Sequence, residues 1–406
     1  MLLCARYIVP VDRPPIENGA ILIEDERIAA LGTAAEFSQP ATDDFGDAVL
    51  LPGLVNAHTH LELTGFAGQI ALSLGFVPWI RTLAGKLLNQ NADTDALQTA
   101  VEDGIRQSLR AGVTTLGDIT RNPASVRPIL SRSPIRTVSF GEVIGIGLGR
   151  DRWARRLDAA ACMNHTGVKL RMGISPHAPY TVEPDGLRAC AARARCMSSP
   201  LCIHVAETPD EEAFTRRLEG GLVELLKGAG VWDEAMVSSG LSPLQLCDQT
   251  GVLGGTTLLA HANYVSDSDI AIIARRDASV AYCPRTHAAF GHAPHRFRDM
   301  LAAGINVCLG TDSLASNPTL SILDELRFLR QYAADVSVDV LLRMGTRSGA
   351  MALGFEENCG TLRAGKVADL VVVPLPSARA AWDAFLEDSA EPIAVYVAGR
   401  QTSLLG

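Results

Sequence analysis

The chain has 406 residues, of which 47% are hydrophobic and 20% are charged, so it can bury a sizeable core and is not expected to be disordered. It carries 45 acidic and 36 basic side chains, and the formal net charge of -9 argues against a nucleic-acid partner bound through a broadly basic surface, although a local basic patch stays compatible with it. No stretch approaches the roughly 18 continuous apolar residues of a membrane helix, so we expect no membrane partner.

The cysteines and the first residues bear on the cellular compartment. The nine cysteines are an odd number at scattered positions, and no Cys-x-x-Cys pair occurs. This pattern disfavours a disulfide framework. The first ten residues lack a basic leader, an apolar run and a cleavage site, which is unlike a signal peptide. We therefore expect a cytoplasmic protein.

Short apolar runs near both ends of the chain predict a small sheet. Residues 19–31 read as two strands around a polar turn, and β-branched runs occur at 368–373 and 393–397. Strands from the two ends can pair with one another. We expect a small β domain built from residues 1–52 and 356–406.

The middle of the chain, residues 53–355, alternates apolar strand-like runs with helical stretches. Eight such runs over this length predict an α/β fold, a (β/α)8 TIM barrel. A buried helix segment can produce the same kind of short run. Residues 210–251 are long for one crossover and predict an extra helix or an excursion over the barrel mouth. The eight runs are 54–58, 113–119, 135–143, 168–174, 201–205, 257–260, 279–283 and 305–309.

Polar side chains recur at the ends of these predicted strands, which meet at one mouth of a barrel. His58 and His60 are two residues apart, so in an extended chain both imidazoles face the same way. Three histidines and one aspartate of such a set suit zinc or another first-row metal. Taken singly, each is also typical of a structural hydrogen bond or a helix cap. The other strand-end residues are His177, His204, Glu207, His261 and Asp312.

Several motifs together resemble the amidohydrolase superfamily over nearly the whole chain. They are Leu-Pro-Gly-Leu-Val-Asn-Ala-His-Thr-His at 51–60, His-Val-Ala-Glu at 204–207, Leu-Ala-His-Ala-Asn at 259–263, Leu-Gly-Thr-Asp-Ser at 309–313 and the closing segment 360–370. Within the superfamily, the chain looks like the branch of aromatic-ring deaminases and chlorohydrolases that binds one metal ion. Members with two metals often carry a bridging lysine after strand four, whereas Lys169 stands at the start of that strand.

The resemblance implies a role for each strand-end residue. His58, His60, His204 and Asp312 would bind one divalent metal ion; zinc suits the set, and iron or manganese also fits. The ion would lower the pKa of a bound water toward about 7. Asp312 would take a proton from that water, and Glu207 would pass a proton to the ring and to the leaving amine. Taken alone, Glu207 has a second interpretation, in which it is a carboxylate at a helix N-terminus that the helix dipole favours. The resemblance assigns two further roles, hydroxide orientation to His261 and substrate contact to His177.

The substrate is expected to be an aminated purine or a similar heterocycle. Deaminases of S-adenosylhomocysteine usually have a ribose-binding glutamate after the tryptophan that Trp79 matches, and this chain has none. Segments 60–65, 75–81, 282–287 and 312–317 look closer to 6-aminodeoxyfutalosine deaminases of the menaquinone route. Arg81 or Arg285 could pair with the benzoate carboxylate of that substrate, or lie in ordinary salt bridges. Glu62 could bind a ring or sugar group, or support the metal ligands.

The sequence therefore predicts a metal-dependent hydrolytic deaminase with a small-molecule substrate. The alternatives in the same superfamily are a methylthioadenosine or S-adenosylhomocysteine deaminase, a chlorohydrolase and an enzyme that opens an amide ring. A non-catalytic scaffold is the alternative outside the enzymes, but the metal-ligand and proton-shuttle positions are all present. Relatives often pair, so a homodimer is a further expectation.

Overall fold

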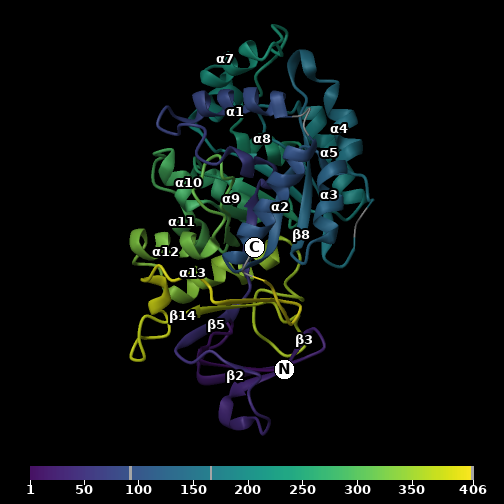
Figure 1. The fold of residues 1–406 in the computed structure, drawn as a ribbon. Helices are drawn as coiled ribbons and strands as arrows, with labels where there is room; N and C mark the ends of the chain where they lie inside the picture. Colours follow the sequence, from purple (N-terminus) through teal and green to yellow (C-terminus); the bar gives the residue numbers. More distant parts are fainter. Residues whose placement is uncertain (91–93, 165–166, 404–406) are drawn as a thin grey trace.

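The computed structural model describes residues 1–90, 94–164 and 167–403. Its larger part is a parallel barrel whose eight strands follow one another in chain order (Figure 1). The barrel closes where the backbone N–H groups of Thr311 and Asp312 both donate to the carbonyl oxygen of His58, each at 3.1 Å. The strands are β6 (Leu54–Thr59), β7 (Val113–Thr120), β8 (Arg136–Val143), β9 (Leu170–Pro176), β10 (Leu201–Val205), β11 (Thr257–His261), β12 (Ser279–Tyr282) and β13 (Val307–Leu309).

The predicted (β/α)8 barrel is confirmed, and each of the eight apolar runs overlaps one of its strands. Only strand ends differ. The eighth strand begins at Val307 and not at residue 305, because the N–H of Ile305 donates to Met300 O at the end of the preceding helix, at 3.0 Å. The fourth strand begins at Leu170, whose carbonyl oxygen accepts from the N–H of Gly167 in a turn before it.

Helices surround the barrel and also cover its mouth. The predicted excursion in residues 210–251 is present as three helices, α6, α7 and α8. Of these, α7 packs with α1 at the end of the molecule that lies opposite the terminal sheet (Figure 1). The helices are α1 (Phe76–Gln90), α2 (Thr94–Arg110), α3 (Pro123–Arg132), α4 (Arg152–Ala160), α5 (Pro184–Cys196), α6 (Pro209–Arg217), α7 (Gly221–Gly228), α8 (Pro243–Gln249), α9 (Asp267–Arg276), α10 (Pro284–Ala289), α11 (Phe297–Ala302), α12 (Ile322–Tyr332), α13 (Val338–Gly345) and α14 (Arg347–Ala352).

The two chain ends form one sheet, as expected, in the order β16-β15-β14-β5-β1-β2-β3, with β4 beside β1. The last three residues of the expected C-terminal part, 404–406, lie outside the described residues. The domain limits at 53 and 355 stay a prediction. The strands are β1 (Leu2–Ile8), β2 (Ile16–Glu24), β3 (Arg27–Thr33), β4 (Asp43–Asp44), β5 (Ala48–Pro52), β14 (Leu370–Pro374), β15 (Ala394–Val397) and β16 (Arg400–Gln401).

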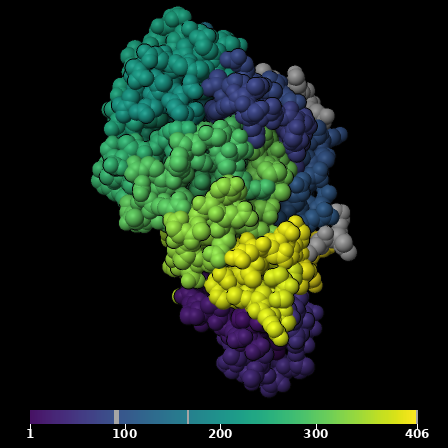
Figure 2. Space-filling model, turned by 90° about the vertical axis from the view of Figure 1, so that its left-hand side faces the viewer, coloured from purple at the N-terminus to yellow at the C-terminus, as the bar shows by residue number. Residues whose placement is uncertain are grey.

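The two faces of this sheet belong to two hydrophobic cores, because side chains alternate along a strand. Val49 and Leu51 of β5 belong to the large core of the barrel. Ala48 and Leu50 belong to a second core on the other face of the sheet. Figure 2 shows the C-terminal segment, in yellow, lying between the barrel and the N-terminal strands.

Two sequence expectations concern the chain as a whole. All nine cysteines are free thiols, in agreement with the absence of a disulfide framework. Within the described part of the chain, none of the helices has both the length and the apolar character that crossing a bilayer requires.

Candidate metal centre and active site

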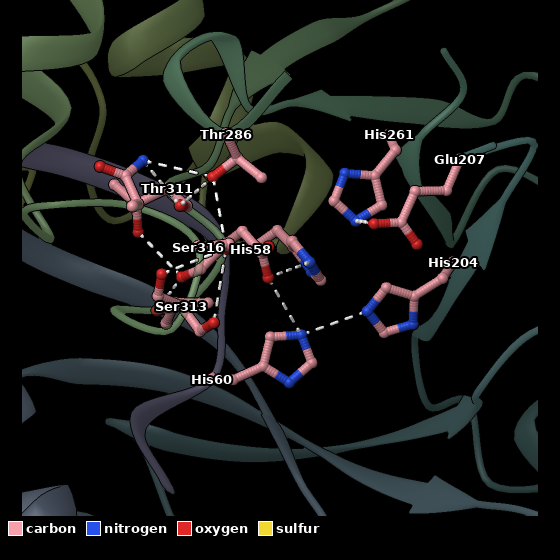
Figure 3. A network of polar contacts seen from close by, with 12 residues as sticks. His58, His60, His204, Glu207, His261, Thr286, Thr311, Ser313 and Ser316 are labelled. Carbon is pink, nitrogen blue, oxygen red and sulfur yellow. Dashed lines mark hydrogen bonds and ion pairs between the residues drawn. The ribbon is translucent and has the colours of Figure 1, made fainter. Parts of the chain in front are cut away.

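Three histidines from two barrel strands face one another at the carboxyl ends of those strands. His58 lies in β6, His60 follows that strand directly, and His204 lies in β10. The Nε2 atoms of His60 and His204 are 3.1 Å apart, and the ring of His58 lies 5.0 Å from each of the other two rings, centroid to centroid. Figure 3 shows the three rings directed toward a common point.

Asp312 completes this group from the segment after β13. Its Oδ1 lies 3.5 Å from His60 Nε2 and 3.8 Å from His58 Nε2. A hydrogen bond orients the carboxylate, since Ser316 Oγ donates to its other oxygen, Oδ2, at 2.5 Å. The backbone of Asp312 has a φ of 57°, a left-handed conformation that is unusual for a residue other than glycine. Local strain of this kind often accompanies functional sites, where the surrounding structure maintains it.

The chemistry of these side chains fits a divalent metal ion. Ligand atoms of His58, His60 and His204 lie within 4.8 Å of one another, as do those of His58, His261 and Asp312. His58 is fully buried, and neither of its ring nitrogens has a hydrogen-bond partner in the described structure. Burial lowers the pKa of His58 well below its ordinary value, so the imidazole is neutral and keeps a lone pair for a metal. Buried nitrogens without partners are rare unless they serve such a purpose.

A backbone hydrogen bond orients one of the candidate ligands. His204 Nδ1 lies 2.9 Å from the carbonyl oxygen of His177, an atom that can only accept. The Nδ1 atom therefore carries the proton, and Nε2 offers its lone pair toward His60. Histidines that bind metals commonly use the other ring nitrogen in this way.

Glu207 lies beside this group, two residues after the end of β10. Its Oε1 is 3.5 Å from His261 Nε2 (Figure 3). Burial, followed by the negative charges of Asp312 and Glu211, raises the pKa of Glu207 well above its ordinary value. Burial likewise raises the pKa of Asp312 to about 7. The arrangement thus places a carboxyl group with a raised pKa next to the histidine group, and a raised pKa favours the protonated form that general acid catalysis needs.

A cavity of about 360 Å³ opens above these residues. His60, His204, Glu207, His261 and Asp312 lie at its polar end. Its other walls are mostly apolar, and they come largely from α1, α7 and the loop after β8. A mostly apolar cavity with a few convergent polar groups is the usual form of a small-molecule site. The apolar lining includes Phe76, Ile80, Leu83, Ile146 and Leu226.

Three of the five predicted substrate-contact residues line this cavity: His177, Glu62 and Trp79. Glu62 already accepts hydrogen bonds from Thr120 Oγ1 and from both nitrogens of Asn122. Trp79 donates through Nε1 to Ala315 O at 3.1 Å, so it presents its ring and not its N–H group to the cavity. Their roles toward a substrate stay predictions.

Arg81 and Arg285 are not brought to the cavity. Arg81 lies on an exposed part of α1. Arg285 Nη1 donates to Thr319 Oγ1 at 2.8 Å and lies 3.4 Å from Asp324 Oδ2, so the salt-bridge interpretation describes it. Motif similarity placed these arginines near the substrate, but side-chain direction and local ion pairs separate them from the cavity.

The cavity contains three charged residues that sequence analysis missed, Arg121, Glu142 and Arg152. Arg121 follows the end of β7, and Glu142 lies one residue before the end of β8. The same strand-end argument that identified the histidines would have identified both. Arg152 begins α4, and no strand-end signal points to it.

Comparison with known proteins decides the family. A profile of the Amidohydrolase family matches residues 49–402. The chain belongs to the amidohydrolase family. This amidohydrolase is 30% identical over 384 residues to a 5-methylthioadenosine/S-adenosylhomocysteine deaminase of Moorella thermoacetica, covering 91% of the chain and 84% of that protein. It is 29% identical over 366 residues to an aminodeoxyfutalosine deaminase of Deinococcus radiodurans, covering 83% of the chain and 81% of that protein.

The fold is shared with solved structures of low sequence identity. An adenosine deaminase from Xanthomonas campestris with bound zinc superposes with a TM-score of 0.84 at 23% identity, covering 98% of this chain and 92% of the other. At this identity the likeness establishes the barrel and the terminal sheet. The resemblance stated from the motifs is therefore confirmed at the level of family and fold.

Proposed function

We propose that this amidohydrolase is a metal-dependent hydrolytic deaminase that releases ammonia from an aminated purine or a related heterocycle. The observation that carries the proposal is the convergence of three histidines and Asp312 beside Glu207, a buried carboxyl group with a raised pKa, at one end of an apolar cavity. The curated relatives whose names are deaminases support the same reaction.

The proposed ligands of one metal ion are His58, His60, His204 and Asp312. A divalent ion there would act as a Lewis acid and make a water molecule nucleophilic at neutral pH. We choose zinc because imidazole and carboxylate ligands without a thiolate suit a catalytic zinc site, and iron or manganese would fit the same set.

Two carboxylates would handle the protons. Asp312 accepts a proton from the attacking water at its carboxylate. Glu207 delivers the proton of its carboxyl group to the ring nitrogen, then takes the proton of the hydroxyl newly formed on the ring carbon and passes it to the amine that leaves. The proton held by Asp312 restores the acid at the end of the cycle. His261, whose Nε2 lies 3.5 Å from Glu207 Oε1, orients the attacking oxygen from the side of the acid. Removal of ammonia needs this sequence because an amide anion is too poor a leaving group without a proton.

We propose an adenine nucleoside as the substrate, with 6-aminodeoxyfutalosine of the menaquinone route as the preferred candidate. The aminodeoxyfutalosine deaminase of Deinococcus radiodurans among the relatives supports this choice. Arg152 also supports it, since it lines the cavity and has no ion-pair partner in the described parts of the chain. The second candidate is methylthioadenosine or S-adenosylhomocysteine, which the relative at 30% identity favours. A cytoplasmic location and a homodimer complete the proposal.

A turnover screen on metal-replete protein tests the reaction. The panel contains aminated purine nucleosides, aminated pterins, a chlorotriazine and a cyclic amide, and the assay follows ammonia, chloride and ring-opened product. Ammonia release from an aminated nucleoside is the expected result. Release of chloride or of ring-opened product without ammonia would show that the enzyme is a chlorohydrolase or opens an amide ring, and would contradict the deaminase proposal. Less than about half an equivalent of metal, with no activation by added zinc, manganese or iron, would contradict a metal enzyme.

The substitution Glu207→Gln tests the proton shuttle. The amide has the same shape but carries no transferable carboxyl proton, so turnover should fall by about 100- to 10,000-fold while the bound metal stays near the parent level. Glu212→Gln is the control, because Glu212 is exposed on α6 and pairs with Arg216. It should leave both turnover and metal content unchanged. A near-normal rate in Glu207→Gln would show that another group moves the proton.

A further inference from the structure

Arg121 and Glu142 form an ion pair in the cavity wall that the proposed chemistry does not use. They stand at the ends of adjacent barrel strands, β7 and β8, and both line the cavity. Arg121 Nε lies 3.5 Å from Glu142 Oε2. Glu142 is only 5% exposed. The pair is therefore a charged feature of the cavity wall in which the carboxylate is buried and the Arg121 side chain is 20% exposed.

The pair leaves hydrogen-bonding capacity unused. Glu142 Oε2 and Arg121 Nη1 are buried, and neither has a hydrogen-bond partner among the described residues. The other oxygen of Glu142, Oε1, lies 4.0 Å from His177 Nε2, which is too far for a hydrogen bond. A buried carboxylate or guanidinium atom without such a partner is costly. A ligand that supplies the missing partners would remove that cost.

Glu62 in the same wall provides a contrast. Its Oε1 accepts from Thr120 Oγ1 and, at 3.0 Å, from the N–H of Asn122, and its Oε2 accepts from Asn122 Nδ2 at 3.2 Å. The chain itself therefore satisfies the carboxylate of Glu62. Of these two carboxylates, Glu142 is the one left with an oxygen to offer to a ligand.

The unused atoms define the chemistry of the group that fits. Glu142 Oε2 is an acceptor, and the neighbouring Arg121 Nη1 is a donor. A hydroxyl both donates and accepts, so one hydroxyl or a vicinal pair can satisfy both atoms. An anionic group would face the carboxylate of Glu142, and a cationic group would face the guanidinium of Arg121. A neutral hydroxyl avoids both repulsions.

The position of the pair relates this hydroxyl to the reacting ring. The ring of His177 lies 4.9 Å from the ring of His204, centroid to centroid, and Glu142 Oε1 lies 4.0 Å from His177 Nε2. We infer that Glu142 and Arg121 bind the sugar hydroxyls of a nucleoside whose base lies over the histidine group. The inference rests on the proposed function and adds that the enzyme selects ribosylated purines over deoxygenated nucleosides and free bases.

The first test changes the substrate and leaves the protein intact. Ammonia release by the parent enzyme is compared for adenosine, 2′,3′-dideoxyadenosine and adenine. Loss of hydrogen bonds to a charged pair should lower kcat/KM for the dideoxy compound about 10- to 100-fold relative to adenosine. Equal values for the two nucleosides would overturn the inference and leave the deaminase proposal standing.

The second test changes the protein. Glu142→Gln should lower kcat/KM for adenosine by about the same 10- to 100-fold and leave that for dideoxyadenosine nearly unchanged. The matched variant Glu62→Gln should affect both nucleosides alike, because the chain already satisfies Glu62. A Glu142→Gln enzyme that loses both activities equally would show that the residue only supports the wall. Circular dichroism shows whether the Glu142→Gln variant folds. If it does not, the comparison of adenosine with dideoxyadenosine on the parent enzyme tests the inference.

A binding measurement separates this inference from the reaction. Where neither nucleoside is turned over, calorimetry on zinc-loaded protein gives the dissociation constants of adenosine and dideoxyadenosine. If no aminated nucleoside releases ammonia, the proposed reaction fails. Tighter binding of adenosine by about 10-fold or more would still support the hydroxyl site, and equal binding would overturn it.

Discussion

Individual buried polar groups carry most of the functional information in this protein. His58 has two buried ring nitrogens without hydrogen bonds, and Glu142 has one such oxygen. Other buried side-chain atoms also lack partners, among them Asp118 Oδ2, Thr137 Oγ1 and Ser175 Oγ. Those of His58 and Glu142 differ in their place, because His58 belongs to the histidine group and Glu142 to the cavity wall. An unpaired buried group destabilises the fold unless a ligand supplies its partner, so at these two places we expect a metal ion and a substrate to supply it.

At the same scale, Arg152 is the residue that we expect to recognise an anionic substrate. Arg152→Gln should raise KM for 6-aminodeoxyfutalosine about 10-fold, because it removes a charge-assisted contact with the carboxylate, and should leave KM for neutral adenosine unchanged. Arg155→Gln is the control, since Arg155 is exposed on the same helix and does not line the cavity. Steady-state kinetics with both substrates make the comparison. A parallel rise for the two substrates would refute a carboxylate contact.

At the scale of elements, close approach of strand ends positions the proposed metal ligands. Gly310 follows β13 directly, and a Cβ added there would lie 2.8 Å from both Cβ and the carbonyl oxygen of His58. Gly310→Ala should therefore displace His58 and weaken zinc binding by about 10- to 100-fold, the range found when groups around metal ligands are changed. Competition with a chromogenic chelator measures the affinity.

Gly254→Ala is the matched control for this substitution. Gly254 lies between α8 and β11, its backbone has no positive φ, and an added Cβ there would meet no heavy atom within 4 Å. Its zinc affinity should equal that of the parent protein. Equal affinities in all three proteins would show that the approach of Gly310 to β6 does not position His58.

For the whole molecule, a buried ion pair joins the terminal sheet to the barrel. Arg136 in β8 lies 3.3 Å from Asp369, and both side chains are almost completely buried. Asp369 also accepts the N–H of Ala398 at 2.8 Å. Asp369→Ala should lower the free energy of unfolding by about 3–5 kcal/mol, because it leaves the charge of Arg136 buried and unpaired. Urea denaturation measures this change.

The exposed pair of Arg298 and Asp335 is the reference for this effect. Asp335→Ala removes a charge that water solvates well, so the urea midpoint should change little. Similar midpoints for Asp369→Ala and Asp335→Ala would mean that the buried pair does not hold the sheet to the barrel.

The hydrophobic pattern of the sequence was sufficient to predict the strands of the barrel. It predicted only some of the strands of the terminal sheet. The eight barrel strands were predictable because strands buried on both faces form continuous apolar runs between helices. In the terminal sheet, β1, β4, β5 and β16 were missed. The first barrel strand was expected to begin at residue 54, as it does, but residues 48–52 were not read as a strand, and the structure shows that they form β5. A local pattern does not specify which sheet a strand joins.

The sequence by itself determined the barrel, the family and the identity of the histidines and carboxylates at the strand ends, because these follow from periodicity and from motifs that are contiguous in the chain. Only the tertiary structure decided which charged groups share the cavity. Arg81 and Arg285 lie outside it, whereas Arg121, Glu142 and Arg152 line it. The direction of a side chain and the partner it finds depend on residues distant in sequence, and no local pattern records them.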